Sequence, residues 1–580
     1  MRAKLSGRRF WFLYIVLFIL FGLIVYQVVQ LTYFHKLSLV ELAHRQHYVT
    51  IDIPPMRGPI TDRIGKEFVS NLKIPSIYAV PRLLDAAGRE RLTKELAQIL
   101  KLDKKFVARR LERDKAFVWL KRRVTFEEAE AVKKLDNPAL GFIEEYKRFY
   151  PQGSLLANVI GFSNVDNQGL EGIELSMDSY LRGKAGKCVT KRDAKGREIK
   201  AFEIKMLPVI NGDTVSLTID QRIQYLTEKA LDAAVKKWKP KGAWVVVMDP
   251  KTGEILALAN RPTFDPNHYD LSAPDSRRNR AVTDMYEPGS VFKIVTASGA
   301  LNEGVVTPST TFFCENGKWN YGVKTLRDVH GYGTLTMEQV IIKSSNIGTV
   351  KIGLKMKRDK LQEYIRGFGF GAYSGIDLKG EAPGYTRPPS QWSKTSPYCI
   401  PIGQEVMVTA LQMATALSVV ANGGYLVKPY IISKVTDPAG VTIKENKPMI
   451  RKVVIKPETA ETMRKILIKV VEEGTGTHAK IPGVIAGGKT GTAQKVLPNG
   501  KGYSHSDFMS SFIGFAPGDN PRYVMAVVLD EARPMYYGGV VAAPVFKEVM
   551  EAAFLTEGIR PVKTTAAPVP KGKNDFSVTD

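Results

Sequence analysis

The chain has 580 residues, 44% of them hydrophobic and 24% charged, a composition that excludes a disordered chain and predicts two or more folded domains. Its formal net charge is +25, from 83 basic and 58 acidic side chains. Because the basic residues are scattered, this excess is as typical of a solvated surface as of a protein that binds a polyanion.

The first predicted element is a transmembrane helix over residues 10–30. Residues 10–29 contain a single polar side chain, Gln27, and twenty helical residues span about 30 Å, the thickness of the hydrocarbon core of a bilayer. The tail before it, residues 1–9, carries four basic side chains and no acid, which predicts that this tail stays in the cytoplasm. No small-residue cleavage site follows, so we expect an uncleaved single-pass anchor with the rest of the chain outside the cytoplasm. That location argues against a nucleic-acid partner.

Residues 31–205 are predicted to form a domain that carries no catalytic spacing. Residues 36–50 favour a helix or a linker, and the charged run from Glu90 to Arg123 favours helices. The phrase Gly169-Leu-Glu-Gly-Ile-Glu174 is interpreted, from its residues alone, as local turn chemistry. The reactive residues are therefore expected further along the chain.

Residues 206–555 are predicted to form a second domain of the α+β class, in which helices flank an antiparallel sheet. Strands at both ends of this segment with helices between them indicate that arrangement. Residues 556–580 have no apolar period and are predicted to form a flexible tail. The predicted elements are a helix over residues 221–238 with Asp220 as its N-cap, a hairpin of 244–248 with 255–258, and a hairpin of 508–515 with 523–529.

The sequence Glu287-Pro-Gly-Ser290-Val-Phe-Lys293 places a serine and a lysine on one face at the start of an apolar helix. A serine hydroxyl needs a neighbouring base before it attacks a carbonyl, and the positive end of a helix dipole favours the negative charge that develops. An apolar, crowded site would lower the pKa of Lys293 until its neutral amine serves as that base. The alternative is a surface lysine whose stem lies over apolar neighbours, and the Ser-x-x-Lys spacing alone favours that alternative.

Two later motifs favour the catalytic interpretation. Ser344-Ser-Asn346 follows a capping-box helix start at Thr336, and its hydroxyl and amide suit the relay of a proton and the holding of a peptide bond. Lys489-Thr-Gly-Thr492 lies ahead of the last hairpin, and its lysine and threonine suit a carboxylate. Its glycine, Gly491, with Gly487 and Gly488, would let a substrate backbone lie close alongside the strand.

Other reactive residue types have plainer interpretations. A second Lys-Thr-Gly, at Lys251–Gly253, lies in a predicted hairpin turn ahead of any nucleophile and is interpreted as structural. His505 and Cys399 are interpreted as ordinary loop or core residues, and with Cys188 and Cys314 the cysteines form neither a disulfide framework nor a metal-binding spacing. No metal- or phosphate-binding pattern is present, so no metal or cofactor is expected.

Ser-x-x-Lys, Ser-x-Asn and Lys-Thr-Gly in this order resemble the signature of β-lactamases and penicillin-binding proteins. With the anchor, four further phrases are similar to those of class B penicillin-binding proteins. They are Arg57-Gly-Pro-Ile-Thr-Asp-Arg63, Arg148-Phe-Tyr-Pro151, Gly169-Leu-Glu-Gly-Ile-Glu174 and Tyr536-Tyr-Gly-Gly-Val-Val-Ala-Ala-Pro544. The resemblance covers nearly the whole chain and implies a β-lactamase-like transpeptidase domain on an elongated N-terminal pedestal.

The resemblance implies a serine-type D-Ala-D-Ala transpeptidase of the bacterial inner membrane, which cross-links peptidoglycan stem peptides through an acyl-enzyme and is a target of β-lactams. The implied catalytic residues are Ser290 as nucleophile, Lys293 as base, and Ser344 and Asn346 for the proton and the donor peptide. The implied substrate-binding residues are Lys489, Thr490, Gly491 and Thr492. Lys489 and Thr490 would hold the donor carboxylate, and the N–H groups of Ser290 and Thr492 would form the oxyanion hole.

Several phrases resemble the septal, FtsI-like branch of this family, which implies an FtsW-type membrane glycan polymerase and other division proteins as partners. These phrases are Phe368-Gly-Phe-Gly371, Gly375-Ile-Asp-Leu-Lys-Gly-Glu381, and Trp392 ahead of Ile402-Gly-Gln-Glu-Val-Met-Val-Thr-Ala-Leu-Gln412. Glu405 departs from the pattern, in which a glycine is expected. The alternatives are an elongation-type class B transpeptidase, a membrane-bound β-lactamase or sensor, and a division scaffold that has lost activity.

Overall fold

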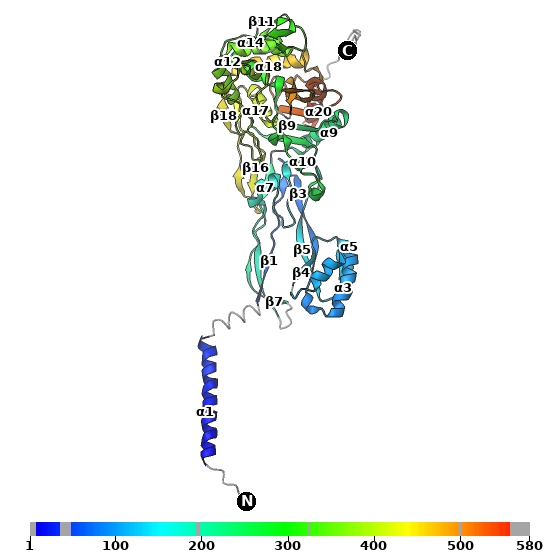
Figure 1. Cartoon of the computed structure of the whole chain (residues 1–580), viewed down its shortest axis with the longest axis vertical. Helices are drawn as coiled ribbons and strands as arrows, with labels where there is room; N and C mark the ends of the chain where they lie inside the picture. The colour runs from blue at the N-terminus through cyan, green and yellow to red at the C-terminus, as the bar shows by residue number, and fades with distance from the viewer. Residues whose placement is uncertain are drawn as a thin grey trace. The chain divides into compact units, whose positions relative to one another are not determined.

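Two units make up the chain in the computed structural model, which describes residues 7–34, 48–115, 117–192, 198–322, 325–497 and 502–556. The first unit contains Met1–Met56 and Gly183–Gly212, and the second contains Arg57–Arg182 and Asp213–Asp580. Figure 1 labels some of the elements of each unit.

The first unit contains the apolar helix α1 (Gly7–Val29), which a π-helical turn (Gln30–Phe34) extends. The stretch Phe10–Tyr33 has a mean hydropathy of 2.6 and exposes its large apolar side chains, as a helix surrounded by lipid does. Within the described residues it is the one helix long and apolar enough to cross a membrane, at the place that the sequence predicts. The predicted helix or linker over residues 36–50 lies outside the described residues, except for its end, which begins strand β1 (Tyr48–Ile53).

A three-stranded antiparallel sheet, in the order β1-β6-β7, completes the described part of this unit. Its other strands are β6 (Gly186–Arg192) and β7 (Glu198–Leu207). β1 pairs with β6 although more than a hundred residues separate them, because the chain leaves this unit after Met56 and returns to it at Gly183.

The second unit contains a seven-stranded sheet that joins strands from both predicted domains. Its order is β17-β16-β8-β2-β3-β4, and β5 also pairs with β3. The parallel pair β2–β8 joins the two groups of strands, with Ile60 opposite Val215. The strands are β2 (Ile60–Thr61), β3 (Glu67–Ala79), β4 (Val118–Lys121), β5 (Leu140–Phe149), β8 (Thr214–Leu217), β16 (Ile432–Thr436) and β17 (Thr442–Glu445).

Three helices pack with strands β3 and β4 around a separate apolar cluster. Asp85 and Asp103 cap the first two of them by accepting a backbone N–H in the first turn. The predicted helical run from Glu90 to Arg123 is confirmed where it covers the first two helices. It is wrong at its end, because the alternately buried residues of β4 form a strand that joins the sheet. The helices are α3 (Ala86–Ile99), α4 (Lys104–Leu111) and α5 (Phe126–Lys133).

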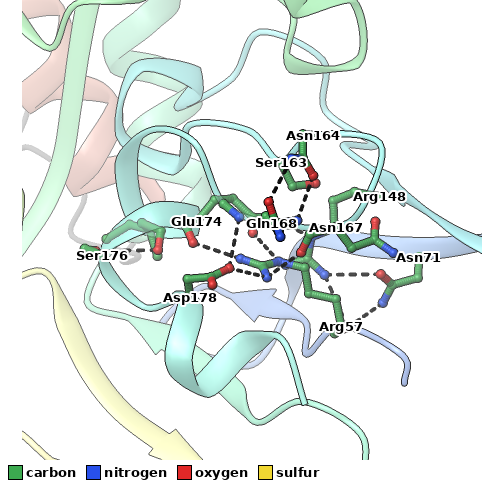
Figure 2. A network of polar contacts seen from close by, with 12 residues as sticks. Arg57, Asn71, Arg148, Ser163, Asn164, Asn167, Gln168, Glu174, Ser176 and Asp178 are labelled. Atoms are coloured by element: carbon green, nitrogen blue, oxygen red, sulfur yellow. Dashed lines mark hydrogen bonds and ion pairs between the residues drawn. The ribbon is translucent and has the colours of Figure 1, made fainter. Parts of the chain in front are cut away.

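A buried ionic network joins three of the phrases that carry the family resemblance (Figure 2). Arg57 Nε lies 2.6 Å from Glu174 Oε2, and Arg57 NH1 lies 2.7 Å from Asp178 Oδ1. Arg148 Nε lies 2.6 Å from the other oxygen of Glu174. Both arginines and Glu174 are buried, and a buried charge that loses its partner costs about 3–5 kcal/mol. The phrase Gly169–Glu174 is therefore more than turn chemistry, because it supplies the carboxylate that pairs both arginines.

A five-stranded antiparallel sheet, in the order β10-β9-β21-β20-β19, forms the centre of the rest of this unit. β9 pairs with β10 and β20 with β21, which confirms both predicted hairpins. The central strands β9 and β21 are buried on both faces, so the sheet needs a helical cover on each side. The strands are β9 (Gly242–Met248), β10 (Ile255–Arg261), β19 (Gly487–Val496), β20 (Tyr503–Ala516) and β21 (Tyr523–Asp530).

Helices cover both faces of this sheet (Figure 1). Val245 and Val247 belong to the apolar cluster formed with α9 (Gln221–Trp238) and α20 (Ala543–Thr556), whereas Val246 and Met248 belong to the larger cluster on the opposite face. α9 starts after Asp220, whose carboxylate accepts the N–H of the residues two and three positions on, which confirms the predicted helix and cap. The helices on the opposite face are α12 (Lys293–Asn302), α13 (Met337–Ile342), α14 (Asn346–Lys355), α15 (Arg358–Gly367), α17 (Ala410–Ala421) and α18 (Pro457–Glu472).

Short elements complete the unit. The two-stranded sheets pair β11 (Thr311–Phe313) with β14 (Thr334–Thr336), β12 (Lys318–Asn320) with β13 (Thr325–Arg327), and β15 (Tyr425–Val427) with β18 (Ile450–Val453). The short helices are α6 (Ala157–Ile160), α7 (Gly172–Ser176), α8 (Asp178–Leu181), α10 (Pro274–Arg277), α11 (Arg280–Thr283), α16 (Ser396–Cys399) and α19 (Gly538–Val541).

Candidate active site

Ser290 lies in a tight 3₁₀ turn (Gly289–Phe292) that leads directly into α12. Gly289 has a φ of +57°, a left-handed conformation that glycine adopts freely, and a Cβ there would come within 3.0 Å of the Ala493 Cβ on β19. The Gly289 N–H donates to the carbonyl of Gly403 at 3.0 Å. The turn is therefore held between β19 and the segment that ends at Gly403, which fixes Ser290 at the start of α12.

Lys293 is the first residue of α12, and its side chain is completely buried. Its Nζ donates to the carbonyl of Ser344 at 2.6 Å and to Asn346 Oδ1 at 2.8 Å, and it lies 3.3 Å from Ser344 Oγ. Burial lowers the pKa of this amine to about 7, and the negative charge of Asp328 opposes that shift. Within the described residues no hydrogen bond joins Lys293 to Ser290, and such catalytic contacts often tighten only when substrate binds.

Lys489 of β19 brings the third motif to the same place. Its side chain is completely buried, and its Nζ donates to Ser344 Oγ at 2.8 Å. Burial lowers the pKa of Lys489 well below its usual value, and the positive charge of Lys293 adds to the effect. Two amines thus flank one hydroxyl, and their repulsion disfavours the state in which both carry a proton. The Ser344 hydroxyl is the point at which the three motifs meet.

The two threonines of the Lys489–Thr492 motif contact segments beside β19. Thr490 Oγ1 lies 2.7 Å from Thr475 Oγ1, and Thr492 Oγ1 accepts the N–H of Gly538 at 3.1 Å. β19 is an edge strand, since only β20 pairs with it among the described strands. An edge strand offers N–H and C=O groups to which an extended peptide can add.

The glycines of β19 serve the packing of the protein itself. A Cβ on Gly491 would come within 2.3 Å of Ser511 Oγ and 3.0 Å of Val291 Cγ1, so glycine lets the strand pack against the turn that carries Ser290. A Cβ on Gly487 or Gly488 would come within 2.3 or 2.5 Å of a phenylalanine ring of β20. At these two positions the sequence prediction is corrected, because the space is filled by the protein's own side chains rather than kept for a substrate.

Two family descriptions match the sequence. Residues 52–217 match the penicillin-binding protein dimerisation domain, and residues 243–551 match the penicillin binding protein transpeptidase domain. The chain belongs to the class B penicillin-binding proteins. The second match contains all three motifs that meet at Ser344.

Relatives of this penicillin-binding protein match it over most of its length. Stage V sporulation protein D of Bacillus subtilis is 36% identical over 558 residues, 94% of this chain and 86% of that protein. Peptidoglycan D,D-transpeptidase FtsI of Escherichia coli K12 is 32% identical over 528 residues, 90% of this chain and 86% of the relative. The crystal structure of penicillin binding protein 3 of Mycobacterium tuberculosis with aztreonam has a TM-score of 0.69 and 30% identity, and it covers 89% of this chain and 100% of that one. The predicted fold class is confirmed.

Glu405 stands where the resemblance to the penicillin-binding proteins predicts a glycine. Its φ is +60°, so the backbone keeps a conformation that glycine adopts without strain. The Glu405 N–H donates to Glu287 Oε1 at 2.8 Å, and its carboxylate accepts from Ser396 Oγ at 2.6 Å. These two hydrogen bonds stabilise Glu405 in a left-handed backbone conformation that residues with a side chain rarely adopt.

Sequence reasoning missed two residues that contact the motifs. Thr475 lies in a glycine-rich phrase between α18 and β19, a signal that marks a close backbone approach. Asp328, which contacts the start of α14, has no such local signal. Among the described residues, His505 and Lys251 make no hydrogen bond to Lys293 or Lys489. His505 is exposed on β20, Cys399 ends α16, and Lys251 lies in the turn after β9, where its Nζ donates to Asn520 Oδ1 at 2.6 Å.

Replacing Ser344 with glycine should separate activity from stability. Ser344 has a φ of +59°, which costs a non-glycine residue about 1–2 kcal/mol, at the end of α13 where helices often finish on glycine. We expect Ser344→Gly to keep the free energy of unfolding within about 1 kcal/mol of the wild type, because relief of strain offsets the greater chain entropy of glycine. The rate of acylation by penicillin should fall by about two orders of magnitude, since the shared hydroxyl is lost. Thermal unfolding measures the stability and penicillin labelling measures the acylation rate, with Ser344→Ala measured alongside for comparison. Labelling of the glycine variant at the wild-type rate would contradict a role for the hydroxyl.

Proposed function

We propose that this penicillin-binding protein is a peptidoglycan D,D-transpeptidase that cross-links stem peptides through an acyl-enzyme on Ser290. The observation that carries the proposal is the convergence of two buried amines, Lys293 and Lys489, on the Ser344 hydroxyl. Amines whose neutral form is favoured by burial are typical of reactive sites. The relatives that are named peptidoglycan D,D-transpeptidases support the substrate class.

In the first half-reaction the neutral amine of Lys293 takes the proton of Ser290, and Ser290 Oγ forms a bond to the carbonyl carbon of the penultimate D-alanine. The N–H groups of Ser290 and Thr492 stabilise the oxyanion. The bond to the terminal D-alanine breaks, and its nitrogen takes a proton through Ser344, while Asn346 orients the peptide and Lys293. In the second half-reaction an amine of the acceptor stem peptide attacks the ester, and Ser290 regains its proton.

The edge strand β19 would bind the donor peptide and β-lactams in the same way. Lys489, Thr490, Gly491 and Thr492 form this subsite, with the terminal carboxylate beside Lys489 and Thr490. A carboxylate that arrives there favours the protonated form of Lys489 and so opposes the effect of burial on its pKa. Substrate binding would therefore favour protonation of Lys489, while the amine of Lys293 stays neutral and able to accept a proton.

The pH dependence of acylation tests this assignment. Only the neutral amine of Lys293 accepts a proton, and its pKa is lowered to about 7. We therefore expect the rate of labelling by a fluorescent penicillin to rise from pH 5 through a single step near pH 7 and to level off above it. Labelling rates measured from pH 5 to 9 on the full-length protein in detergent provide the profile. A flat profile in a folded protein would count against Lys293 as the base.

The arrangement along the chain belongs to the same proposal. Residues 1–9 form a cytoplasmic tail and 10–30 the transmembrane helix, with the catalytic domain outside the cytoplasmic membrane. Residues 31–205 form the pedestal and 206–555 the transpeptidase domain, followed by the tail 556–580. The basic residues before an apolar helix of mean hydropathy 2.6 support this orientation.

We assign the enzyme to cell division, beside an FtsW-type glycan polymerase and other division proteins, on the septal phrases and the similarity to FtsI. Depletion should give long filaments without septa, and a tagged copy should gather at midcell, as microscopy of a depletion strain would show. Round, swollen cells with a dispersed signal would assign it to elongation instead. A defect confined to spores would place it with its sporulation relative.

Two other activities give different results in the same labelling assay. A membrane-bound β-lactamase or sensor relative that hydrolyses penicillin would turn over the label in minutes, whereas a transpeptidase keeps the acyl group. A division scaffold without activity would take up no label. Retention of the fluorescent adduct by the membrane protein therefore distinguishes the proposed function from both.

A further inference from the structure

Asp328 holds the start of helix α14 from a different segment of the chain. It follows β13, and its Oδ2 accepts from Ser345 Oγ at 2.6 Å. Its Oδ1 accepts the backbone N–H of Asn346 and, at 3.1 Å, that of Ile347. The first N–H groups of a helix have no partner within the helix. One carboxylate thus satisfies two of these donors together with the Ser345 hydroxyl that caps the helix.

The residue before Asp328 orients the side chain of Asn346. The carbonyl of Arg327 accepts from Asn346 Nδ2 at 2.9 Å, which leaves Asn346 Oδ1 to accept from Lys293 Nζ at 2.8 Å. The amide of Asn346 therefore has one orientation that satisfies both contacts. The segment Arg327–Asp328 fixes the backbone and the side chain of the residue that contacts the amine.

We propose that Asp328 is a positioning residue for acyl transfer, which fixes Ser344 and Asn346 against the amine of Lys293 and places a negative charge near that amine. The inference rests on the proposed function, in which Lys293 is the base. It adds a residue that no motif of the sequence includes.

The charges around the amine give this proposal a measurable consequence. Burial lowers the pKa of Lys293, and Asp328 opposes that effect. The other charged group that acts between these motifs is Lys489, on which Lys293 has a repulsive effect. Asp328 also acts on two other groups, because burial raises the pKa of the Cys314 thiol and of the Tyr332 hydroxyl and the charge of Asp328 adds to both shifts. Loss of the Asp328 charge should therefore make the protonated form of Lys293 less stable.

The test is the pH profile of penicillin acylation in Asp328→Asn. Asparagine still offers an oxygen to the helix N–H groups and an amide to Ser345, so the fold should be kept while the charge is lost. We expect the midpoint of the profile to fall by about one pH unit below that of the wild type, the lower end of what a nearby opposite charge does. A merely structural role would lower the rate at every pH and leave the midpoint in place.

Two further variants make the outcome decisive. Glu315→Gln removes a negative charge from a neighbouring segment, where Glu315 pairs with Lys351, and it should leave the midpoint unchanged. Asp328→Ala loses both the charge and the contacts, so its plateau rate should also fall, by about tenfold or more. Any of three results would overturn the proposal. They are an unchanged midpoint in folded Asp328→Asn, an equal shift of the midpoint in Glu315→Gln, and a wild-type plateau rate in Asp328→Ala. A wild-type profile without a step would instead refute Lys293 as the base.

Discussion

Replacing Ser290 with alanine is expected to abolish covalent labelling by penicillin while the protein remains folded. In the proposed mechanism the hydroxyl of Ser290 forms the ester. Among the residues that the structure describes, no other serine combines a helix start with a buried lysine one turn later and the two later motifs. The side chain is small and partly exposed, so its loss should change the free energy of unfolding by less than about 1 kcal/mol. Gel fluorescence of labelled membranes and thermal unfolding of the purified protein measure the two effects.

Ser298 provides a matched control on the same helix. It is completely buried, and its hydroxyl has no hydrogen-bond partner among the described residues. Ser298→Ala therefore removes the same atom without touching the site, and labelling should match the wild type, with stability unchanged or slightly raised. Persistent labelling of folded Ser290→Ala would refute the assignment of Ser290 as the nucleophile. An equal loss of labelling in Ser298→Ala would show that a disturbance of the helix, rather than removal of the Ser290 hydroxyl, causes the loss.

The second large effect is expected at Lys489. Methionine has nearly the same length and suits a buried position, so Lys489→Met keeps the packing of β19 while it removes the contact to Ser344 Oγ and the cation that a carboxylate would meet. We expect the acylation rate to fall by about two to three orders of magnitude, the effect of losing a preorganised polar group at a reacting centre. Stopped-flow or timed gel labelling gives the rate.

The chain contains its own control for this variant. Lys251 belongs to the other Lys-Thr-Gly, where its exposed amine contacts Asn520 in a turn. Lys251→Met should change the acylation rate by less than about twofold, because surface turn side chains are usually near neutral. Similar losses in the two variants would contradict the assignment of Lys489 to the substrate.

Much of the transpeptidase segment could be predicted because its signals are local. Asp220 and the apolar spacing that follows define α9, and the turn residues between apolar runs define both hairpins of the five-stranded sheet. The three motifs could be assigned in advance by family resemblance, but spacing alone could not show that Lys293 and Lys489 meet at one hydroxyl.

The features that escaped prediction depend on contacts between distant segments. Asp328 contacts Ser345 seventeen positions later, and an isolated aspartate in a loop has no pattern that reveals such a partner. The glycines of β19 suggested an opening for substrate, but the rings that fill it come from β20. Glu174 lies 117 positions from Arg57, so the residues around Glu174 in the sequence could not predict that it pairs with two arginines.

The most direct test of the account is the mass of the acylated peptide. The intact protein, incubated with benzylpenicillin and digested with trypsin, should yield the peptide from Ala281 to Lys293 with the mass of one penicilloyl group added, and fragmentation should place that group on Ser290. The same adduct should be absent after denaturation of the protein before incubation, because the reaction needs the buried lysines in place. An adduct on any other residue, or none on folded protein, would contradict the account.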